Sequence, residues 1–241
     1  MLQTVIRMLR SGGEIDFASL VFLFFGYMVL ILVLMPVHEC AHAFVADRLG
    51  DKTPRWNGRL TLNPMAHIDW LGAAMILLFG IGYARPVPVS PRHFKNARRD
   101  MALTALAGPV SNLLMAIVSV GIFRVLLLFG GGVENGMLYA NSDAQWLYYA
   151  YVVLIQVFAS VNIGLAVFNL LPIPPLDGYH VAQCLFMNAK TYKFFGFVEK
   201  YSYVILVAVL IINSRTHFLN TIVYWLMMPL MNLASLILSI F

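Results

Sequence analysis

The feature that most constrains the fold of this chain is an apolar run that passes directly into a group of polar residues. Residues 17–35 include no charged side chain, and a helix of that length nearly crosses the ~30 Å hydrocarbon core of a membrane. His38, Glu39 and His42 follow at once. Ionisable side chains at membrane depth are costly, and they usually face a protein interior or a wet cavity with a partner. The fold must therefore supply a partner for these three residues.

His38, Glu39 and His42 form a His-Glu-x-x-His pattern. On a helix the two histidines lie one turn apart on the same face, so their neutral imidazoles can hold one zinc ion. Glu39 can then act as general base on water. The pattern alone is weak, because two histidines packed inside a helical core give the same letters. A bound cation explains all three polar residues at membrane depth better than packing does.

Composition extends the membrane assignment to the whole chain. The 241 residues are 61% hydrophobic and 11% charged, with a mean hydropathy of +0.80. These values predict an all-α polytopic membrane protein. The net charge of +5 is explained by membrane topology, and no basic run interleaved with aromatics suggests a nucleic-acid partner. Two cysteines, Cys40 and Cys184, give no disulfide framework.

Hydropathy predicts about five transmembrane helices, which cover residues 17–46, 101–129, 146–171, 194–212 and 218–241. Pro36 is expected to kink the first helix, and Gly108-Pro109 to interrupt the second. The apolar segment 71–83 is about 13 residues long, too short to cross comfortably. Residues 60–62 precede an Asn63-Pro64 turn and could form a short β-strand near the histidines.

The distribution of basic residues orients these helices. Segments 47–59, 85–100 and 178–200 together hold twelve of the sixteen Lys and Arg residues, whereas segment 133–145 holds none. Basic loops stay on the cytoplasmic side. Both ends of region 47–100 are therefore expected to be cytoplasmic, and a single crossing by 71–83 would break that parity. Length and parity together predict that this segment is re-entrant, or a hairpin that dips into the membrane and returns.

A zinc ion held by two histidines needs a third protein ligand, with the fourth position left for water. The topology places the ends of the first and third helices on the same side. The third helix runs into a proline-rich stretch that ends in Asp177, the only acidic residue between Asp143 and Glu199. Asp177 on its own could be a turn aspartate before Gly178. Its position after a broken helix, on the side of the histidines, favours metal ligation.

Three motifs in this order resemble the site-2 protease family of intramembrane zinc metalloproteases. The segment His38-Glu39-Cys40-Ala41-His42 matches the zinc helix of the family. Ala107-Gly108-Pro109-Val110-Ser111-Asn112 matches its Gly-Pro-x-x-Asn signature. Asn169-Leu170-Leu171-Pro172-Ile173-Pro174-Pro175-Leu176-Asp177-Gly178 matches its N-x-x-P-x-P-x-L-D-G motif completely. The resemblance covers about residues 30–178.

The resemblance implies an enzyme that hydrolyses peptide bonds in or near the transmembrane segments of membrane-protein substrates, within the lipid bilayer. It implies one Zn²⁺ per chain with ligands His38, His42 and Asp177, and Glu39 as the base. It also implies that Asn169 lies near the scissile peptide, as a backbone or oxyanion contact. The chain has no segment for a PDZ domain or a CBS pair, so it resembles the minimal members.

Length, charge distribution and the resemblance together set the expected organisation and location. We expect a single membrane-embedded metalloprotease domain over 1–241, with a catalytic core of about 17–189. We expect an integral protein of a bacterial inner (plasma) membrane, with the active site towards the cytoplasm. The sequence does not determine the substrate or the oligomeric state.

Two further residues are weaker candidates for substrate binding or oxyanion stabilisation. Asn112 could support the site or simply pack, and the family pattern favours function. His67 lies in the predicted re-entrant region, where a substrate or oxyanion contact and a surface or turn histidine are equally consistent with the sequence.

The competing interpretation is a non-catalytic membrane protein, either a metal transporter or a metal-binding scaffold. A transporter should carry further ionisable residues along its other spans, and Arg124 is the main one. A scaffold would not need Glu39. The sequence therefore favours an enzyme.

Overall fold

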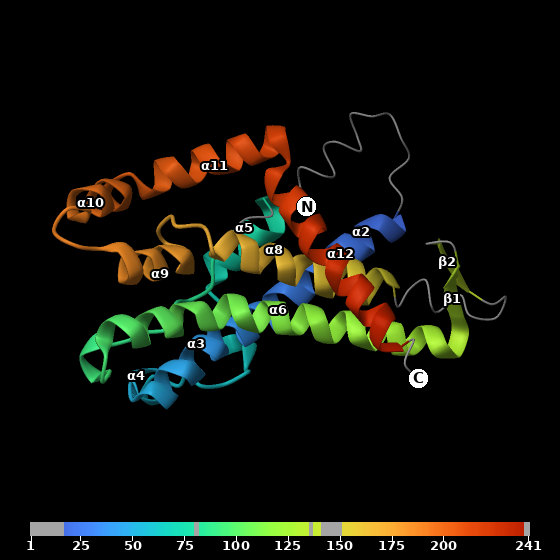
Figure 1. Cartoon of the computed structure of the whole chain (residues 1–241), viewed down its shortest axis with the longest axis horizontal. Helices are drawn as coiled ribbons and strands as arrows, with labels where there is room; N and C mark the ends of the chain where they lie inside the picture. The colour runs from blue at the N-terminus through green and yellow to red at the C-terminus, as the bar shows by residue number, and fades with distance from the viewer. Residues whose placement is uncertain (1–16, 80–81, 135–136, 141–150, 239–241) are drawn as a thin grey trace. The chain divides into compact units, whose positions relative to one another are not determined.

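A computed structural model of the chain describes residues 17–79, 82–134, 137–140 and 151–238 (Figure 1). Most of these residues are helical, in agreement with the prediction from composition. The chain divides into two compact units, Met1–Gly108 and Pro109–Phe241. Each unit is described by itself below.

The first unit begins with one long helical run that carries the His-Glu-x-x-His pattern. Its three parts are α2 (Phe17–Val29), the π-helical segment η1 (Leu30–Leu34) and α3 (Met35–Leu49). The N–H of Met35 donates to the carbonyl of Leu30, five residues back, which is the wider spacing of a π-turn. Pro36 follows directly and has no N–H to donate. Gly50 ends α3 in a left-handed conformation with φ 118°.

A compact polar region follows, with α4 (Thr53–Trp56) and the short 3-10 helix η2 (Pro64–Ala66). The structure does not confirm the β-strand expected at residues 60–62, which form bends and irregular backbone. Local hydrogen bonds account for the difference. The hydroxyl of Thr61 accepts from the N–H of Asn63, and the carbonyl of Thr61 accepts from the ring of His67. The side chain of Asn63 in turn caps η2.

Helix α5 (Trp70–Phe79) covers most of the segment predicted to be re-entrant. Its 10 residues span about 15 Å, half of a hydrocarbon core. After α5 the chain returns to the start of the helix. A Cβ on Gly72 would lie 2.0 Å from the carbonyl oxygen of Tyr83, and the N–H of Arg85 donates to the carbonyl of His67 at 2.8 Å. The segments before and after α5 are therefore neighbours.

Helix α6 (Ala97–Gly130) follows the short 3-10 helix η3 (Pro91–His93) and belongs to both units. Its 34 residues contain Pro109. The prediction that Gly108-Pro109 interrupts the helix is wrong. Proline removes one backbone donor, but the turns before and after it keep their own hydrogen bonds, so a long helix tolerates it. The helix ends at Gly130, the first of three consecutive glycines.

The second unit continues with an antiparallel hairpin, β1 (Gly131–Glu134) and β2 (Met137–Ala140), in which Gly131 pairs with Ala140. The remaining elements are η4 (Val152–Ala159, π-helical), α8 (Ser160–Asn169), α9 (Asp177–Phe186), α10 (Tyr192–Lys200), α11 (Ser202–Thr216) and α12 (Phe218–Leu238). Part of the predicted third helix, residues 146–150, lies outside the described residues.

The core of the second unit lies between α6, α8 and α12, and Figure 1 shows α8 beside α12. Buried apolar side chains of α6 and of the η4–α8 run form its centre: Ala116, Val120, Phe123, Ile155, Ala159 and Ile163. Met227 and Met231 of α12 pack against this cluster.

Two helices in the described part of the chain are long and apolar enough to cross a membrane, Phe24–Leu49 and Ala97–Leu126. Helices α10 and α11 are bent by 73° at their junction and would make a third span if the pair forms one. The structure thus agrees with a membrane protein, and it does not confirm a count of five transmembrane helices.

Candidate active site

His38 and His42 bring two ring nitrogens together on one face of α3. Both side chains are buried. Their Nε2 atoms are 3.1 Å apart, and the rings stand nearly perpendicular, at 84°. Two nitrogen ligands of a tetrahedral zinc, each about 2.05 Å from the metal, are separated by about 3.3 Å. The spacing of the two imidazoles therefore fits two ligands of a single zinc ion.

The tautomer of His42 is set by the backbone of α6. The Nδ1 of His42 lies 2.7 Å from the carbonyl oxygen of Thr104, to which an Nδ1–H donates. A neutral imidazole with its proton on Nδ1 presents a lone pair at Nε2, which is the form that binds a metal. The hydroxyl of Thr104 donates to the carbonyl of Asp100 at 2.8 Å, within the preceding helical turn. The chain thus holds His42 ready for a metal at Nε2.

Glu39 follows His38 on α3 and is half-buried. Its charge acts on Arg59. Burial lowers the pKa of the Arg59 guanidinium, the positive charge of Arg85 lowers this pKa further, and Glu39 opposes both effects. The carboxylate of Glu39 therefore lies within electrostatic range of an arginine side chain.

Asp177 is the first residue of α9, in the second unit, and is half-buried. The loop before it folds tightly back on the end of α8. A Cβ on Gly178 would lie 2.2 Å from the carbonyl oxygen of Leu170. Because of this return, Asp177 lies near the end of α8, where Asn169 is the last helical residue. The N-x-x-P-x-P-x-L-D-G stretch thus folds as one compact turn within its own unit.

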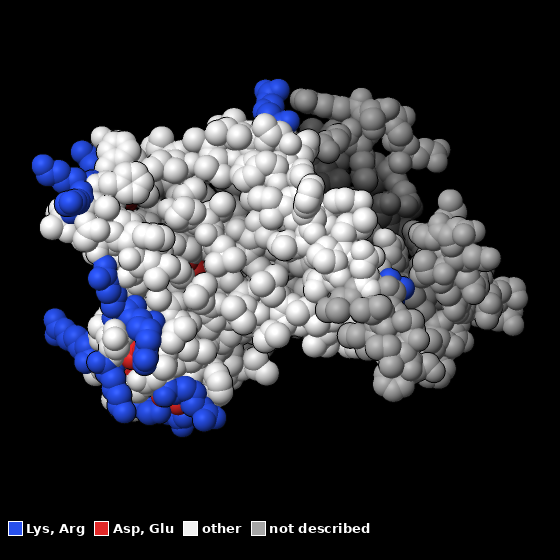
Figure 2. Space-filling view, in the orientation of Figure 1, with Lys and Arg blue, Asp and Glu red and all other residues white. Residues whose placement is uncertain are grey.

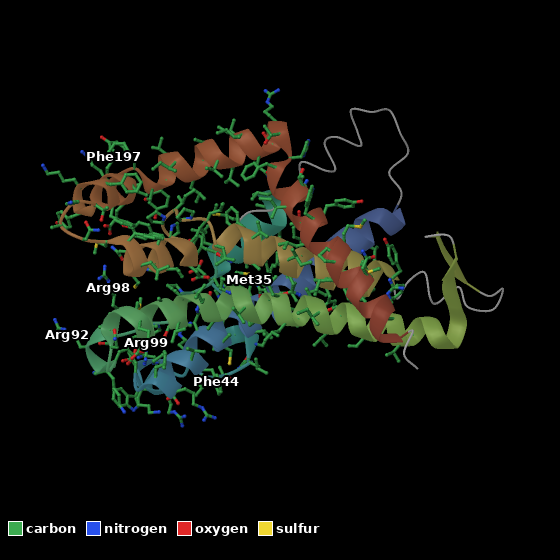
Figure 3. The ribbon with its side chains drawn as sticks, viewed as in Figure 1. Met35, Phe44, Arg92, Arg98, Arg99 and Phe197 are labelled. Carbon is green, nitrogen blue, oxygen red and sulfur yellow. The ribbon has the colours of Figure 1, made fainter. Side chains whose placement is uncertain are left out.

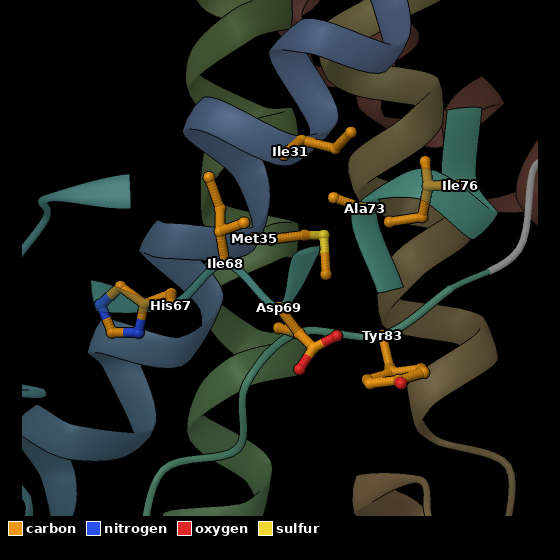
Figure 4. A pocket seen from close by; sticks show the side chains of 9 residues that line it. Ile31, Met35, His67, Ile68, Asp69, Ala73, Ile76 and Tyr83 are labelled. Carbon is orange, nitrogen blue, oxygen red and sulfur yellow. The ribbon is translucent and has the colours of Figure 1, made fainter. Parts of the chain in front are cut away.

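His67 is 1% exposed, which excludes the surface histidine considered as an alternative. Its Nε2 donates to the carbonyl of Thr61 at 2.8 Å, so the ring holds the turn before α5. It also lines a pocket of about 10 Å³ together with Met35, Asp69 and Tyr83 (Figure 4). That volume matches about one water molecule. A substrate contact for His67 stays a prediction.

Asn112 is fully buried in α6. Neither its amide oxygen nor its amide nitrogen has a hydrogen-bond partner within the part of the chain that the structure describes. Burying an amide without partners costs about 1–3 kcal/mol. The burial of an unpaired amide is consistent with a polar ligand at Asn112.

The sequence did not reveal a buried carboxylate after α3. Asp51 is completely buried and accepts hydrogen bonds from Thr53, the N–H of Ser90 and the ring of His93. The Asp-x-Thr spacing could have indicated the hydrogen bonds from Thr53 to Asp51. The bonds from Ser90 and His93 to Asp51 depend on the fold and have no local sequence signal. The ring of His93 lies 2.8 Å from the Asp51 carboxylate and so ties its segment to the end of α3.

Many basic side chains of the described part of the first unit belong to α4, the start of α6 and the residues next to them, and Lys and Arg gather on this face in Figure 2. Arg92, Arg98 and Arg99 are labelled there in Figure 3. They belong to the segments that the charge bias assigns to the cytoplasm.

Comparison with known proteins agrees with these features. Residues 26–213 match the model of Peptidase family M50. Two relatives carry the name "Putative zinc metalloprotease". YwhC of Bacillus subtilis is 41% identical over 66% of this chain and 68% of its own length. Rip2 of Mycolicibacterium smegmatis is 30% identical over 80% of this chain and 70% of its own length. Another relative called "Putative zinc metalloprotease", MJ0611 of Methanocaldococcus jannaschii, is 30% identical over 66% of this chain and 73% of its own length. No solved structure matches this chain.

Residues from α2 to α11 thus match one class of enzyme, the zinc metallopeptidases of the membrane. The chain belongs to Peptidase family M50, the site-2 protease family. It is an intramembrane zinc metalloprotease, and its metal is zinc. His38 and His42 in the first unit, and Asp177 in the second, carry donor atoms of the kinds that bind a metal ion.

Proposed function

We propose that His38, His42 and Asp177 hold the zinc ion and that Glu39 is the catalytic base. The observation that carries this proposal is the pair of Nε2 atoms 3.1 Å apart, with the His42 ring fixed by the Thr104 carbonyl. Two histidines and one carboxylate are a ligand set of catalytic zinc sites, which leave one position open. A zinc ion bound there would polarise the substrate carbonyl and lower the pKa of its water to about 7.

The residues of the chain supply the proton transfers and the orientation. Glu39 takes a proton from the attacking water and delivers it to the leaving amine when the peptide bond breaks. Asn169 donates a hydrogen bond to the developing oxyanion or to the substrate backbone, at the end of α8. Asn112 and His67 are the further candidates for such contacts. Asn112 is the stronger candidate, because its buried amide has no partner among the described residues and is free to bind a substrate. His67 is the weaker one, because its Nε2 already donates to the carbonyl of Thr61.

The substrates that we propose are membrane proteins, cleaved in or near a transmembrane segment, as in regulated intramembrane proteolysis. The peptide bonds of a membrane helix are already hydrogen-bonded, so the helix must open locally before water can attack. Residues 84–90, beside the return from α5, have no helix or strand of their own and could hold an opened segment by strand addition.

We further propose a single functional domain over 1–241 in a bacterial inner membrane, a location that the bacterial relatives support. The charge bias supports an active site towards the cytoplasm. The neighbouring backbones of His67 and Arg85 support a re-entrant α5, because a segment that enters and leaves at adjacent points has both ends on one side. A metal transporter or a non-catalytic scaffold is not favoured by the family match.

The test is a Glu39→Gln variant of the full chain, co-expressed with a membrane-protein substrate and also purified for metal analysis. Glutamine keeps the size of the side chain but cannot accept the proton. We expect stoichiometric zinc and a normal thermal midpoint, with cleavage reduced by about 100-fold or more.

The matched control is Glu199→Gln, because Glu199 is an exposed carboxylate on α10. It should leave both zinc content and cleavage unchanged. Normal cleavage by Glu39→Gln would remove Glu39 from its assigned role. Loss of zinc from that variant would make Glu39 a ligand instead.

A further inference from the structure

The glycine of the Gly-Pro pair in α6 faces the two metal-binding histidines. A Cβ placed on Gly108 would lie 2.3 Å from the Nε2 of His42, 2.6 Å from the Nε2 of His38 and 2.5 Å from the Cε1 of His38. Heavy atoms that are not bonded do not approach to such distances. The backbone of α6 thus lies against the metal-binding edges of both rings.

The neighbouring rings have little freedom to move away from an added methyl group. Both imidazoles are buried. A rotation of His42 would break the 2.7 Å bond between its Nδ1 and the carbonyl of Thr104. Thr104 lies one turn before Gly108 on the same face of α6, so a shift of the helix that relieved one contact would disturb the other.

Helix propensity alone would favour alanine over glycine at position 108, so the glycine there needs another explanation. Gly108 lies inside a 34-residue helix, where alanine is the better residue for the backbone. Its neighbours Ala105 and Ala107 show that the turn accepts a methyl group at other positions. The absence of a side chain at 108 therefore has a local cause, and the atoms that an added Cβ would meet are those of the two histidine rings.

We infer that Gly108 is a positioning residue for the metal: it keeps open the space at the Nε2 atoms of His38 and His42 that the zinc must occupy. Thr104 and Gly108 then act together as one wall of the site. The carbonyl of Thr104 sets the tautomer of His42, and the bare Cα of Gly108, one turn later, leaves room for coordination. This inference rests on the proposed ligand set.

The first measurement is the zinc content of purified full-length protein. Gly108→Ala should weaken zinc binding by about 100-fold or more, because even indirect supports of a ligand are worth about 10–100-fold. The matched control is Gly121→Ala in the same helix, where an added Cβ meets nothing within 4 Å. Gly121→Ala should keep stoichiometric zinc. Stoichiometric zinc with unchanged affinity in Gly108→Ala would overturn the inference.

The second measurement does not depend on zinc. The thermal midpoint of chelated protein is compared with and without Gly108→Ala, in the wild-type chain and in a His38→Ala, His42→Ala chain. Since the contact is with the imidazoles, Gly108→Ala should lower the midpoint only while they are present. Recovery of folding in the histidine-free chain supports the inference, and equal damage in both chains contradicts it.

The two measurements separate this inference from the proposed function. If the wild-type chain holds no zinc at these histidines, the proposed ligand set fails, whereas the chelated comparison still tests the steric contact. If His38→Ala loses zinc and Gly108→Ala keeps it, the ligand set stands and the role of Gly108 fails.

Discussion

At the scale of single residues, the histidines of this chain are distinguished by what their rings contact. His67 donates to a backbone carbonyl, and His93 pairs with the buried carboxylate of Asp51. The role of His217 is in the backbone: it ends α11 in a left-handed conformation with φ 53°. In His38 and His42 the two Nε2 atoms converge on each other. Two like nitrogens that converge in a buried place fit the spacing of two ligands of one cation, which is the role proposed for them.

Replacement of Asp177 tests the third ligand. Asp177→Ala should leave two protein ligands, so zinc should no longer be retained through purification, while the chain stays folded. Metal analysis after dialysis, together with a thermal midpoint, measures both. Stoichiometric zinc in this variant would exclude Asp177 from the ligand set. His38→Ala provides the positive control, since it should lose zinc in any case.

At the scale of elements, short polar contacts hold the connections between helices in place. The carboxylate of Asp51 joins the end of α3 to η3, and the guanidinium of Arg55 makes two 2.8 Å bonds to Asp47. These contacts fix the segments on either side of α5, the helix that returns on itself.

Asp51 should make the stability of this region sensitive to acid. Burial by itself raises the pKa of the Asp51 carboxyl, but hydrogen bonds from Thr53, His93 and the N–H of Ser90 outweigh it, and the net pKa lies below the usual value. The unfolded chain therefore binds this proton more readily. The stabilisation is fully present above the unfolded pKa of about 3.9 and is lost as the pH falls through the lower folded pKa.

An Asp51→Asn variant measures this contribution. At neutral pH its free energy of unfolding should be lower by about 2 kcal/mol, because buried donors lose a charged acceptor. Its thermal midpoint should fall accordingly. The difference from the wild-type chain should shrink as the pH falls below about 4. Thermal unfolding at a series of pH values in detergent gives both quantities. A difference that is independent of pH would show that the charge of Asp51 contributes nothing.

The return of the chain after α5 depends on a glycine. A Cβ on Gly72 would meet the backbone carbonyl of Tyr83 at 2.0 Å, and backbone cannot yield as a flexible side chain does. Gly72→Ala should therefore cost about 1–3 kcal/mol and expose residues 82–90 to protease. Gly26→Ala, in α2, adds a methyl group where nothing lies within 4 Å and should have no such effect. Equal protection of both variants would argue against the close return.

At the scale of the whole molecule, the orientation in the membrane decides which side supplies water to the site. Twelve of the sixteen basic residues fall in three segments assigned to the cytoplasm. Cysteines placed at Lys52, Lys95 and Lys190, in a chain without Cys40 and Cys184, should be labelled from the cytoplasmic side. A cysteine at Asn135, which lies outside the described residues, should be labelled from the other side. Labelling of Lys52 and Lys95 from opposite faces would make α5 part of a true crossing.

Much of this protein was predictable because its strongest signals are local. The His-Glu-x-x-His spacing fixes a shared helix face wherever it lies on a helix, since helical geometry is periodic. The apolar run before it required a membrane helix, because hydrocarbon allows few alternatives for the backbone. The motif that ends in Asp177 and Gly178 predicted a broken backbone after a helix, and the chain turns there as expected.

The tertiary structure decided the features that depend on partners distant in sequence. Nothing near Asp51 indicates that its carboxylate meets residues 90 and 93, and nothing near Gly108 indicates that its missing side chain faces two rings on α3. The strand expected at residues 60–62 failed for the same reason, since a strand needs a partner and local bonds satisfied the backbone first. Periodicity specifies the face of a helix, whereas only packing determines what that face meets.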